Sequence, residues 1–209
     1  FHPQISNLIS IIKSGEIGEL LSVESYFGNN IIKKKNIFGF KKFKINKNSR
    51  LFNKNLGGGS ILDLGCYPSS LSIMLAKLKS NINKNKVIFK KKNIIMGETD
   101  VDLDGYAEIE FENYFKAKIG CSFQKDLDKF TKIEGSKKSI KLTNSWSNNQ
   151  AQIMINSKTY DISNKFKNIL SYEIEGISNM LERANIKLKT HTWIDLKQNL
   201  ILAYLRNGE

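Results

Sequence analysis

The spacing of apolar residues changes along this chain, and its first part shows both helical and extended patterns. Apolar residues recur every three or four positions between Pro3 and Gly15, which predicts a short amphipathic helix with one buried face. The stretch 19–28 is rich in Val, Tyr and Phe, which predicts a strand. One side of this strand would carry Leu21, Val23, Ser25 and Phe27.

A longer apolar run at 61–78 has few polar residues and predicts a buried helix. Gly65 and the pair Tyr67-Pro68 interrupt this run. The residue before a proline avoids the helical region, whereas proline itself fits the first turn of a helix. We therefore expect a break near 65–67 and a new helix beginning at Pro68. The preceding stretch 29–56 has no clear period, and we expect a long loop there.

From Val87 to about Ile162 the period becomes two, which is typical of strands. The clearest case is a hairpin with its turn at Asn113, and further strands are expected near 87–96, 130–135, 138–143 and 150–156. Two helices then close the chain. The first, 172–184, would point Ile174, Ile177 and Leu181 inward, and the second, 193–205, would do the same with Leu196, Leu200 and Ala203. Consecutive strands with short connections favour an α+β fold, in which helices pack on one face of a mixed, largely antiparallel sheet.

Composition places the chain among ordinary globular proteins of one domain, spanning 1–209. It has 209 residues, of which 40% are hydrophobic and 25% charged. Two cysteines cannot form a disulfide framework, and no Cys/His cluster has metal-ligand spacing, so we expect a cytoplasmic protein without a metal. No run of 18 apolar residues is present, so no membrane partner is expected. Because the chain begins at Phe1 rather than Met, we expect it to be a fragment.

The net charge of +13 is concentrated in one segment. Between Ile31 and Asn55 there are nine Lys and Arg residues and no Asp or Glu. Phenylalanines interleave with these cations, which could indicate a surface for single-stranded nucleic acid. However, lysine greatly outnumbers arginine throughout the chain, whereas specific nucleic-acid recognition favours arginine. We therefore interpret the segment as a compositional bias and keep nucleic-acid binding as a rival hypothesis that predicts strong salt dependence.

The most unusual motif is the glycine triplet 57–59, which stands directly before the apolar run. Glycines remove side chains where something approaches the backbone closely or where φ is positive, although a flexible turn would also explain them. Asp63 and Tyr67 follow, four residues apart, so a helix would place them on the same face. A carboxylate and a phenol in an apolar segment need partners. The alternative to a functional pair is that Asp63 caps a helix and Tyr67 packs its ring.

These residues carry a resemblance to a known family. The opening Phe-His-Pro-Gln, the string Ser-Gly-Glu-Ile-Gly-Glu-Leu at 14–20, and Gly-Gly-Gly-Ser-Ile-Leu-Asp-Leu-Gly-Cys-Tyr-Pro at 57–68 occur in the order and spacing of one domain. That domain is the substrate-side, C-terminal domain of the glucose-fructose oxidoreductase / inositol dehydrogenase / MocA family. Many members have histidine where this chain has Tyr67, and tyrosine there resembles the branch of xylose and dihydrodiol dehydrogenases.

The resemblance implies an oxidoreductase that uses NAD or NADP and acts on a sugar, a polyol or a related hydroxy compound. On this analogy Tyr67 would be the acid/base and Asp63 its support, while Arg50, Gly58 and Gly59 would contact the substrate. The family's N-terminal Rossmann domain, with its GxGxxG loop and Glu-Lys-Pro motif, is absent from the sequence. Homo-oligomerisation through the open sheet is also implied. The rival within this fold is a non-catalytic dimerisation module.

Other candidate residues have simpler explanations. Arg50 could equally be a solvated loop residue, since most arginines are exposed. We expect His2 to be an exposed terminal residue and His191 to stand at the start of the last helix. Cys66, beside Tyr67, is expected to be a small buried hydrophobic residue rather than an activated thiolate, because no nearby His or Lys would lower its pKa.

Overall fold

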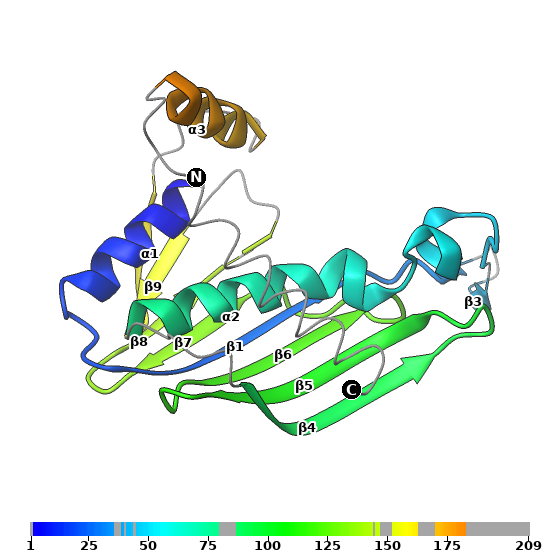
Figure 1. Ribbon diagram of the computed structural model, residues 1–209, viewed down its shortest axis with the longest axis horizontal. Coiled ribbons are helices and arrows are strands. Elements are labelled where there is room, and N and C mark those ends of the chain that lie inside the picture. Colours follow the sequence, from blue (N-terminus) through cyan, green and yellow to red (C-terminus); the bar gives the residue numbers. More distant parts are fainter. Residues whose placement is uncertain are drawn as a thin grey trace.

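The chain folds around one eight-stranded sheet with helices above it (Figure 1). The computed structural model describes residues 2–35, 39, 41–43, 45–79, 87–143, 145–146, 152–162 and 170–182. The order across the sheet is β10-β9-β8-β7-β1-β6-β5-β4. The strands are β1 (Leu20–Gly28), β4 (Val87–Met96), β5 (Asp102–Phe111), β6 (Lys116–Ser122), β7 (Thr131–Gly135), β8 (Ser139–Leu142), β9 (Gln152–Ile155) and β10 (Lys158–Asp161). Within the described residues only β1 and β6 pair in parallel, so the predicted mixed, largely antiparallel α+β sheet is confirmed.

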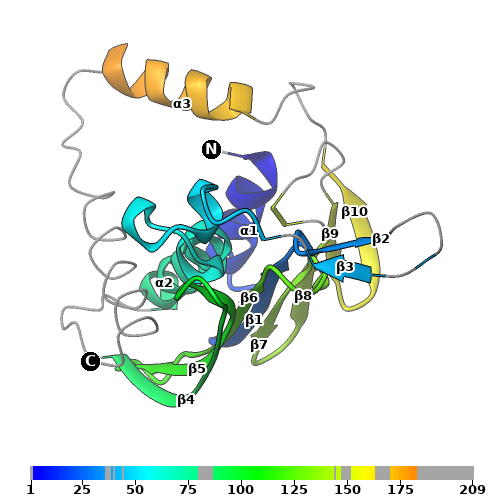
Figure 2. The ribbon, with the colours of Figure 1, turned by 90° about the vertical axis from the view of Figure 1, so that its right-hand side faces the viewer.

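Two helices cover one face of this sheet. They are α1 (Pro3–Lys13) and α2 (Cys66–Lys79), and both lie on the same side in two perpendicular views (Figures 1 and 2). The strands bury alternate residues beneath them. On β5, Ala107, Ile109 and Phe111 are each at most 1% exposed, whereas the residues between them are only partly covered. The predicted hairpin around Asn113 is therefore confirmed, and its apolar side forms the centre of the core.

Strand β1 departs from the predicted alternation at one position. Leu20 and Val23 are buried, but Leu21 is 42% exposed. The pairing of β1 with β7 shifts its register between Leu20 and Ser22, as in a β-bulge. One extra residue in a strand reverses the side to which the preceding side chain points. The prediction that Leu21 shares the side of Val23 and Phe27 was therefore wrong, because Leu20 takes that place.

The predicted break in the second helix does not occur. Ile61–Gly65 forms a π-helical turn, η3, which continues directly into α2. A π turn widens the helix by one residue, and such single turns inside α-helices are frequent at functional sites. Pro68 is the third residue of α2 and has no N–H to donate to the preceding turn. The wider π turn before it allows the helix to continue from Gly65 through Pro68.

The basic stretch 29–56 is not a structureless loop. It contains two short antiparallel strands, β2 (Lys33–Lys35) and β3 (Lys41–Phe43), and two 3₁₀ turns, η1 (Arg50–Phe52) and η2 (Lys54–Leu56). The 3₁₀ turns are anchored by Phe52, which is 5% exposed and packs edge-to-face on Phe123. A strand of three residues is too short to show an alternation in sequence, which is why the pattern missed it.

At the N-terminal end, His2 is partly buried rather than exposed. Its Nδ1 accepts a hydrogen bond from the N–H of Gln4, 3.2 Å away, so it caps α1. Its ring also meets the ring of Tyr172 at 5.3 Å, edge to face. The expectation of an exposed terminal residue was wrong, because Pro3 begins the helix and leaves the preceding side chain in the cap position.

Helix α3 (Leu170–Glu182) matches the predicted helix at 172–184, but its inward face was predicted wrongly. Ile174 and Ile177 are 67% and 52% exposed, while Tyr172 is 6% exposed. The helix stands away from the sheet (Figures 1 and 2), so its apolar stripe does not reach the core. A stripe identifies an apolar face but not what covers it. Leu181, His191 and the predicted helix at 193–205 lie outside the residues whose side chains are described.

Candidate functional site

The predicted pair Asp63 and Tyr67 lies at the beginning of the long helix formed by η3 and α2. The helix starts directly after the glycine triplet, where the N–H of Asp63 donates to the carbonyl of Gly59 at 3.2 Å. The π turn places Asp63 before the junction and Tyr67 just after it. Tyr67 remains 46% exposed, whereas Leu64 and Gly65 between them are buried. The phenol is therefore at the rim of the covered face, where a ligand could reach it.

Arg50 belongs to the same cluster. It comes from η1, and its Nη2 lies 2.5 Å from Oδ1 of Asp63. The side chains are 58% and 24% exposed, so this ion pair is open to solvent on one side. Asp63 therefore does not cap a helix, which was the structural alternative. The structure brings Arg50, Asp63 and the Tyr67 region together, although the roles assigned to them stay predictions.

Two aromatic residues that the sequence did not indicate surround Tyr67. Its ring packs edge-to-face on Phe27, with centroids 5.3 Å apart, and lies 5.8 Å from the ring of Trp146. Trp146 is held in place because its indole N–H donates to the carbonyl of Tyr26 at 2.9 Å. Phe27 lies near the end of β1 and Trp146 follows β8, so no local pattern links them to Tyr67. Tyr67 therefore packs its ring, as the alternative to a functional pair expected, while its acid/base role stays a prediction.

The surroundings of Tyr67 favour its neutral form. Burial raises the pKa of the phenol above its ordinary value, and Cys66, the Asp63 carboxylate and Glu173 of α3 raise it further. Within the described residues the Tyr67 hydroxyl has no acceptor side chain, so its proton is available to a ligand. Burial, followed by Asp63, also raises the pKa of the Cys66 thiol, which matches the expectation of an inert cysteine.

Other parts of the chain occupy the space beside Gly58 and Gly59, where side chains would otherwise stand. A Cβ on Gly58 would lie 2.7 Å from the carbonyl oxygen of Arg50, and a Cβ on Gly59 would lie 2.3 Å from Oδ1 of Asp102. A carboxylate already stands at this helix start, where a phosphate would otherwise bind, and like charges repel. The described residues therefore do not fit a dinucleotide at the triplet. Substrate contact by Gly58 and Gly59 stays a prediction.

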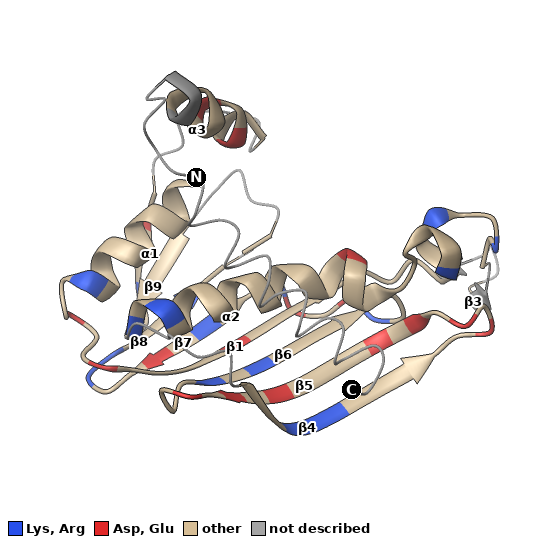
Figure 3. Cartoon of the chain, viewed as in Figure 1, with Lys and Arg blue, Asp and Glu red and all other residues tan. Residues whose placement is uncertain are grey.

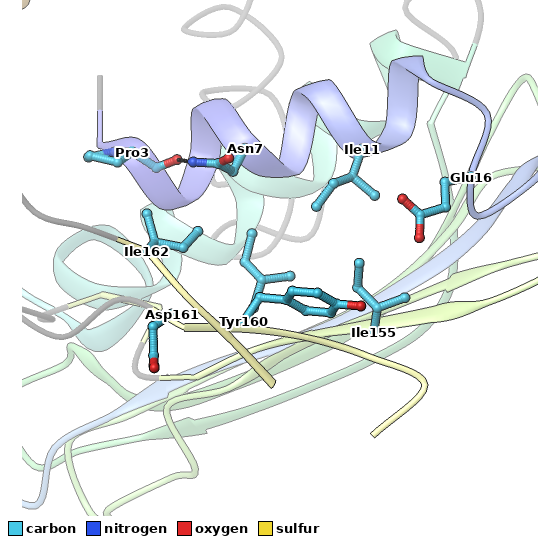
Figure 4. A pocket seen from close by; sticks show the side chains of 9 residues that line it. Pro3, Asn7, Ile11, Glu16, Ile155, Tyr160, Asp161 and Ile162 are labelled. Carbon is cyan, nitrogen blue, oxygen red and sulfur yellow. Dashed lines mark hydrogen bonds between the residues drawn. The ribbon is translucent and has the colours of Figure 1, made fainter. Parts of the chain in front are cut away.

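A separate cavity of about 590 Å³ lies between α1 and the hairpin of β9 and β10 (Figure 4). Ile11, Ile155 and Ile162 line it, with the Tyr160 ring between them and Glu16 at one end. None of the predicted site residues lines this cavity. In the described part of the chain, no three His, Cys, Asp or Glu residues are grouped to hold a metal, and no helix is both long and apolar enough to cross a membrane.

Comparison with protein families agrees with this architecture. The family model for the GFO/IDH/MocA C-terminal domain matches residues 5–141, a span that begins in α1 and ends in β8. This chain belongs to the GFO/IDH/MocA family. The match covers β1, the glycine triplet, the helix with Asp63 and Tyr67, and the β5–β6 hairpin, so the resemblance seen in the sequence is confirmed. The tyrosine-type branch of the family stays a prediction.

Solved structures share the fold of this GFO/IDH/MocA domain at low sequence identity. KijD10, a 3-ketoreductase from Actinomadura kijaniata in complex with NADP and TDP-benzene, is 16% identical with a TM-score of 0.75, over 99% of this chain and 59% of that one. The aldose-aldose oxidoreductase from Caulobacter crescentus, complexed with glycerol, is 15% identical with a TM-score of 0.73, over 100% and 59%. A putative oxidoreductase from Erwinia carotovora atroseptica is 11% identical with a TM-score of 0.62, over 98% and 60%.

These likenesses concern the fold, and the chain spans about three fifths of the length of the structures it matches. No curated protein sequence matches this GFO/IDH/MocA domain significantly.

Proposed function

We propose that this chain is the substrate-side domain of an NAD- or NADP-dependent oxidoreductase that acts on a sugar, a polyol or a related hydroxy compound. The observation that carries the proposal is the half-exposed Tyr67 phenol near the Arg50–Asp63 pair, within the span that the family model matches. The solved neighbours support it, because two of them are described as a ketoreductase with NADP and as an aldose-aldose oxidoreductase.

The dinucleotide would be held outside the described residues, because the glycine triplet here is filled by protein atoms. When bound, a nicotinamide supplies or accepts a hydride. The contribution of this chain is the proton. A phenol is protonated at neutral pH, so Tyr67 would donate its proton to a carbonyl oxygen of the substrate. Its raised pKa keeps that proton in place to a higher pH.

Arg50 and Asp63 would bind the hydroxyl groups beside the reacting carbon. The guanidinium offers donors and the carboxylate offers acceptors, and both side chains are partly exposed. Their ion pair keeps the two groups in a fixed relation, which suits a ligand with adjacent hydroxyls. Phe27 and Trp146 hold the Tyr67 ring, so its hydroxyl has few orientations.

The test is the Tyr67→Phe variant of the complete gene product, assayed by oxidation of NADH or NADPH with a panel of ketosugars and aldoses. Phenylalanine keeps the ring contacts with Phe27 and Trp146 and removes only the hydroxyl. We expect kcat to fall about 10²–10⁴-fold, the usual contribution of positioned proton transfer. Tyr160→Phe is the matched control, because Tyr160 is 44% exposed and lies in the separate cavity. If the two variants turn over substrate equally well, the acid/base role is wrong.

We also propose that the open face of the sheet joins two copies of this chain. That face is not covered by α1 or α2, and neighbouring strands carry charges of both signs (Figure 3). The residues that alternate with the buried ones include Glu108 on β5, Lys118 on β6 and Lys132 on β7. Two such faces could meet with acidic residues of one copy against basic residues of the other.

Sedimentation of the Ser22→Arg variant tests this interface. Ser22 lies half-buried on the open face of β1, near the middle of the sheet, so an arginine there would separate the two copies. We expect the parent to sediment as a dimer or larger assembly and the variant as a monomer. Ser10→Arg, on the exposed side of α1, should keep the parent's assembly state. A monomeric parent, or an unchanged Ser22→Arg variant, would exclude this interface.

A further inference from the structure

The helix that carries Asp63 and Tyr67 has no side-chain cap of its own. Its backbone hydrogen bonds begin at the carbonyl of Gly59, and glycine has no side chain that could bind the first free N–H groups. The cap comes from another strand. Asp102, the first residue of β5 and 1% exposed, accepts a hydrogen bond at Oδ2 from the N–H of Ile61 at 2.6 Å. The hydroxyl of Ser60 donates to the same oxygen at 3.0 Å.

The glycine is what makes room for this carboxylate. A Cβ at position 59 would lie 2.3 Å from Oδ1 of Asp102, and Gly59 has a φ of 119°, which other residues rarely adopt. A negative charge at the start of a helix is also favoured by the helix dipole. Gly59 and Asp102 are therefore complementary, although they lie far apart in the sequence.

The same carboxylate is connected to the other half of the site. The N–H of Gly59 donates to the carbonyl of Leu51 at 2.9 Å, and that of Gly58 donates to the carbonyl of Asn53, also at 2.9 Å. These bonds tie the glycine loop to η1, which carries Arg50. Asp102 therefore packs against Gly59, the residue that joins the two parts of the site. The helix with Asp63 and Tyr67 begins after Gly59, and η1 is bonded to its N–H.

We infer that Asp102 is a positioning residue, which sets Tyr67 and Asp63 in register with Arg50 by capping the helix from β5. The inference deepens the proposed function and rests on it for its effect on turnover. Its effect on the geometry of Tyr67 is independent of any reaction. Asp102 lies in the core and does not line the substrate side, so it acts through the helix rather than on the substrate.

The hydrogen bonds predict how substitutions should differ. Oδ2 accepts both bonds, while Oδ1 makes no hydrogen bond within the described residues. Asp102→Asn keeps an acceptor oxygen for Ile61 and Ser60, with the amide nitrogen in the place of Oδ1. Asp102→Ala removes the cap altogether. Asp104→Ala is the matched control, because Asp104 lies two residues further on β5 and bonds with Ser122 on the opposite face.

Steady-state kinetics of the complete gene product tests the effect on turnover. We expect Asp102→Ala to lower kcat roughly 10- to 100-fold with little change in KM, since a displacement of about 1 Å at a reacting group costs that much. Asp102→Asn should recover most of kcat, and Asp104→Ala should match the parent. Equal losses in the Asn and Ala variants, or an equal loss in the control, would overturn the inference.

A spectroscopic readout separates this inference from the proposed function. Tyrosine labelled with ¹³C at Cζ reports the titration of each phenol, and the Tyr67→Phe variant assigns the Tyr67 signal. We expect Asp102→Ala to move the Tyr67 midpoint towards its ordinary value and to leave that of Tyr106 unchanged. If Tyr67→Phe keeps full turnover, the proposed acid/base role of Tyr67 fails, but this shift still tests Asp102. An unshifted Tyr67 midpoint would refute the positioning role.

A milder variant covers the case in which Asp102→Ala does not fold. Ser60→Ala removes one of the two bonds to Oδ2 and keeps the bond from Ile61. It should shift the Tyr67 midpoint in the same direction by a smaller amount. A Ser60→Ala spectrum identical to the parent's, in a protein whose Asp102→Ala variant is unfolded, would count against the inference.

Discussion

The two faces of the sheet are built from alternate residues of the same strands, and β5 shows how differently they are composed. Ala107, Ile109 and Phe111 are buried beneath the helices. Tyr106 and Glu108 point to the open face, where the Tyr106 hydroxyl donates to the Glu108 carboxylate at 2.7 Å. The covered face is held by apolar contact, whereas the open face satisfies its polar groups among themselves.

The phenols of Tyr26, Tyr106 and Tyr67 also differ between the two faces of the sheet. On the open face Tyr26 donates to Glu24 at 2.8 Å, as Tyr106 does to Glu108, so both protons are engaged. Tyr67, on the helix that covers the other face, has aromatic neighbours and no carboxylate acceptor among the described side chains. The comparison shows why Tyr67, rather than a better-bonded tyrosine, is the candidate proton donor.

The largest difference between the faces is expected in stability. Ile109→Ala should lower the free energy of unfolding by about 2–5 kcal/mol, because it leaves a cavity in the core. Glu108→Ala, its neighbour on the open face, should cost at most about 1 kcal/mol, the net worth of one hydrogen bond. Urea unfolding of both variants measures this. Equal losses would mean that the open face is as important to the fold as the covered face.

A smaller difference is expected at alkaline pH. Burial and the Glu108 carboxylate raise the pKa of Tyr106 to about 12, compared with about 10 in an unfolded chain. The folded state therefore keeps a proton that the unfolded state loses, and the resulting stability is complete below about pH 10 and disappears as the pH rises towards 12.

The Tyr106→Phe variant isolates this effect. Between about pH 9 and 11 it should lose less stability than the parent, as measured by urea unfolding at each pH. Tyr114→Phe is the control, because Tyr114 is 75% exposed in the turn of the hairpin. Parallel pH curves for the parent and Tyr106→Phe would show that the raised pKa has no consequence for folding.

The smallest effect concerns the two thiols, which should differ in reactivity without any change in stability. Cys121 is 4% exposed on the covered face, and burial raises its pKa to about 12. Cys66 is half-buried beside Tyr67. A thiol reagent at neutral pH should label Cys66 slowly and Cys121 only on unfolding, which the Cys66→Ser variant would show. Fast labelling of that variant would contradict the buried position of Cys121.

Local patterns were sufficient for most of the fold. The alternation of Ala107, Ile109 and Phe111 predicted both the β5–β6 hairpin and its buried side, because successive side chains of a strand point to opposite faces. Pro3 predicted the start of α1 for an equally local reason. The patterns failed at Leu21 and at Gly65–Pro68, where a bulge and a π turn added one residue to a regular element.

The candidate site likewise contains residues that the sequence indicated and residues that it did not. The motif and its spacing indicated Asp63, Tyr67 and Arg50 from the sequence, since the first two are four residues apart on one helix. Phe27, Trp146 and Asp102 could not be found in this way, because each comes from a different strand or loop.

By itself, then, the sequence determined the alternating strands, the three α-helices that the structure describes, the family and the candidate site residues, all of which depend on neighbours along the chain. Only the tertiary structure decided what surrounds Tyr67 and what caps its helix. A carboxylate at the start of β5 can serve a helix 41 residues earlier only after the sheet has formed, because folding alone brings the two within hydrogen-bond distance.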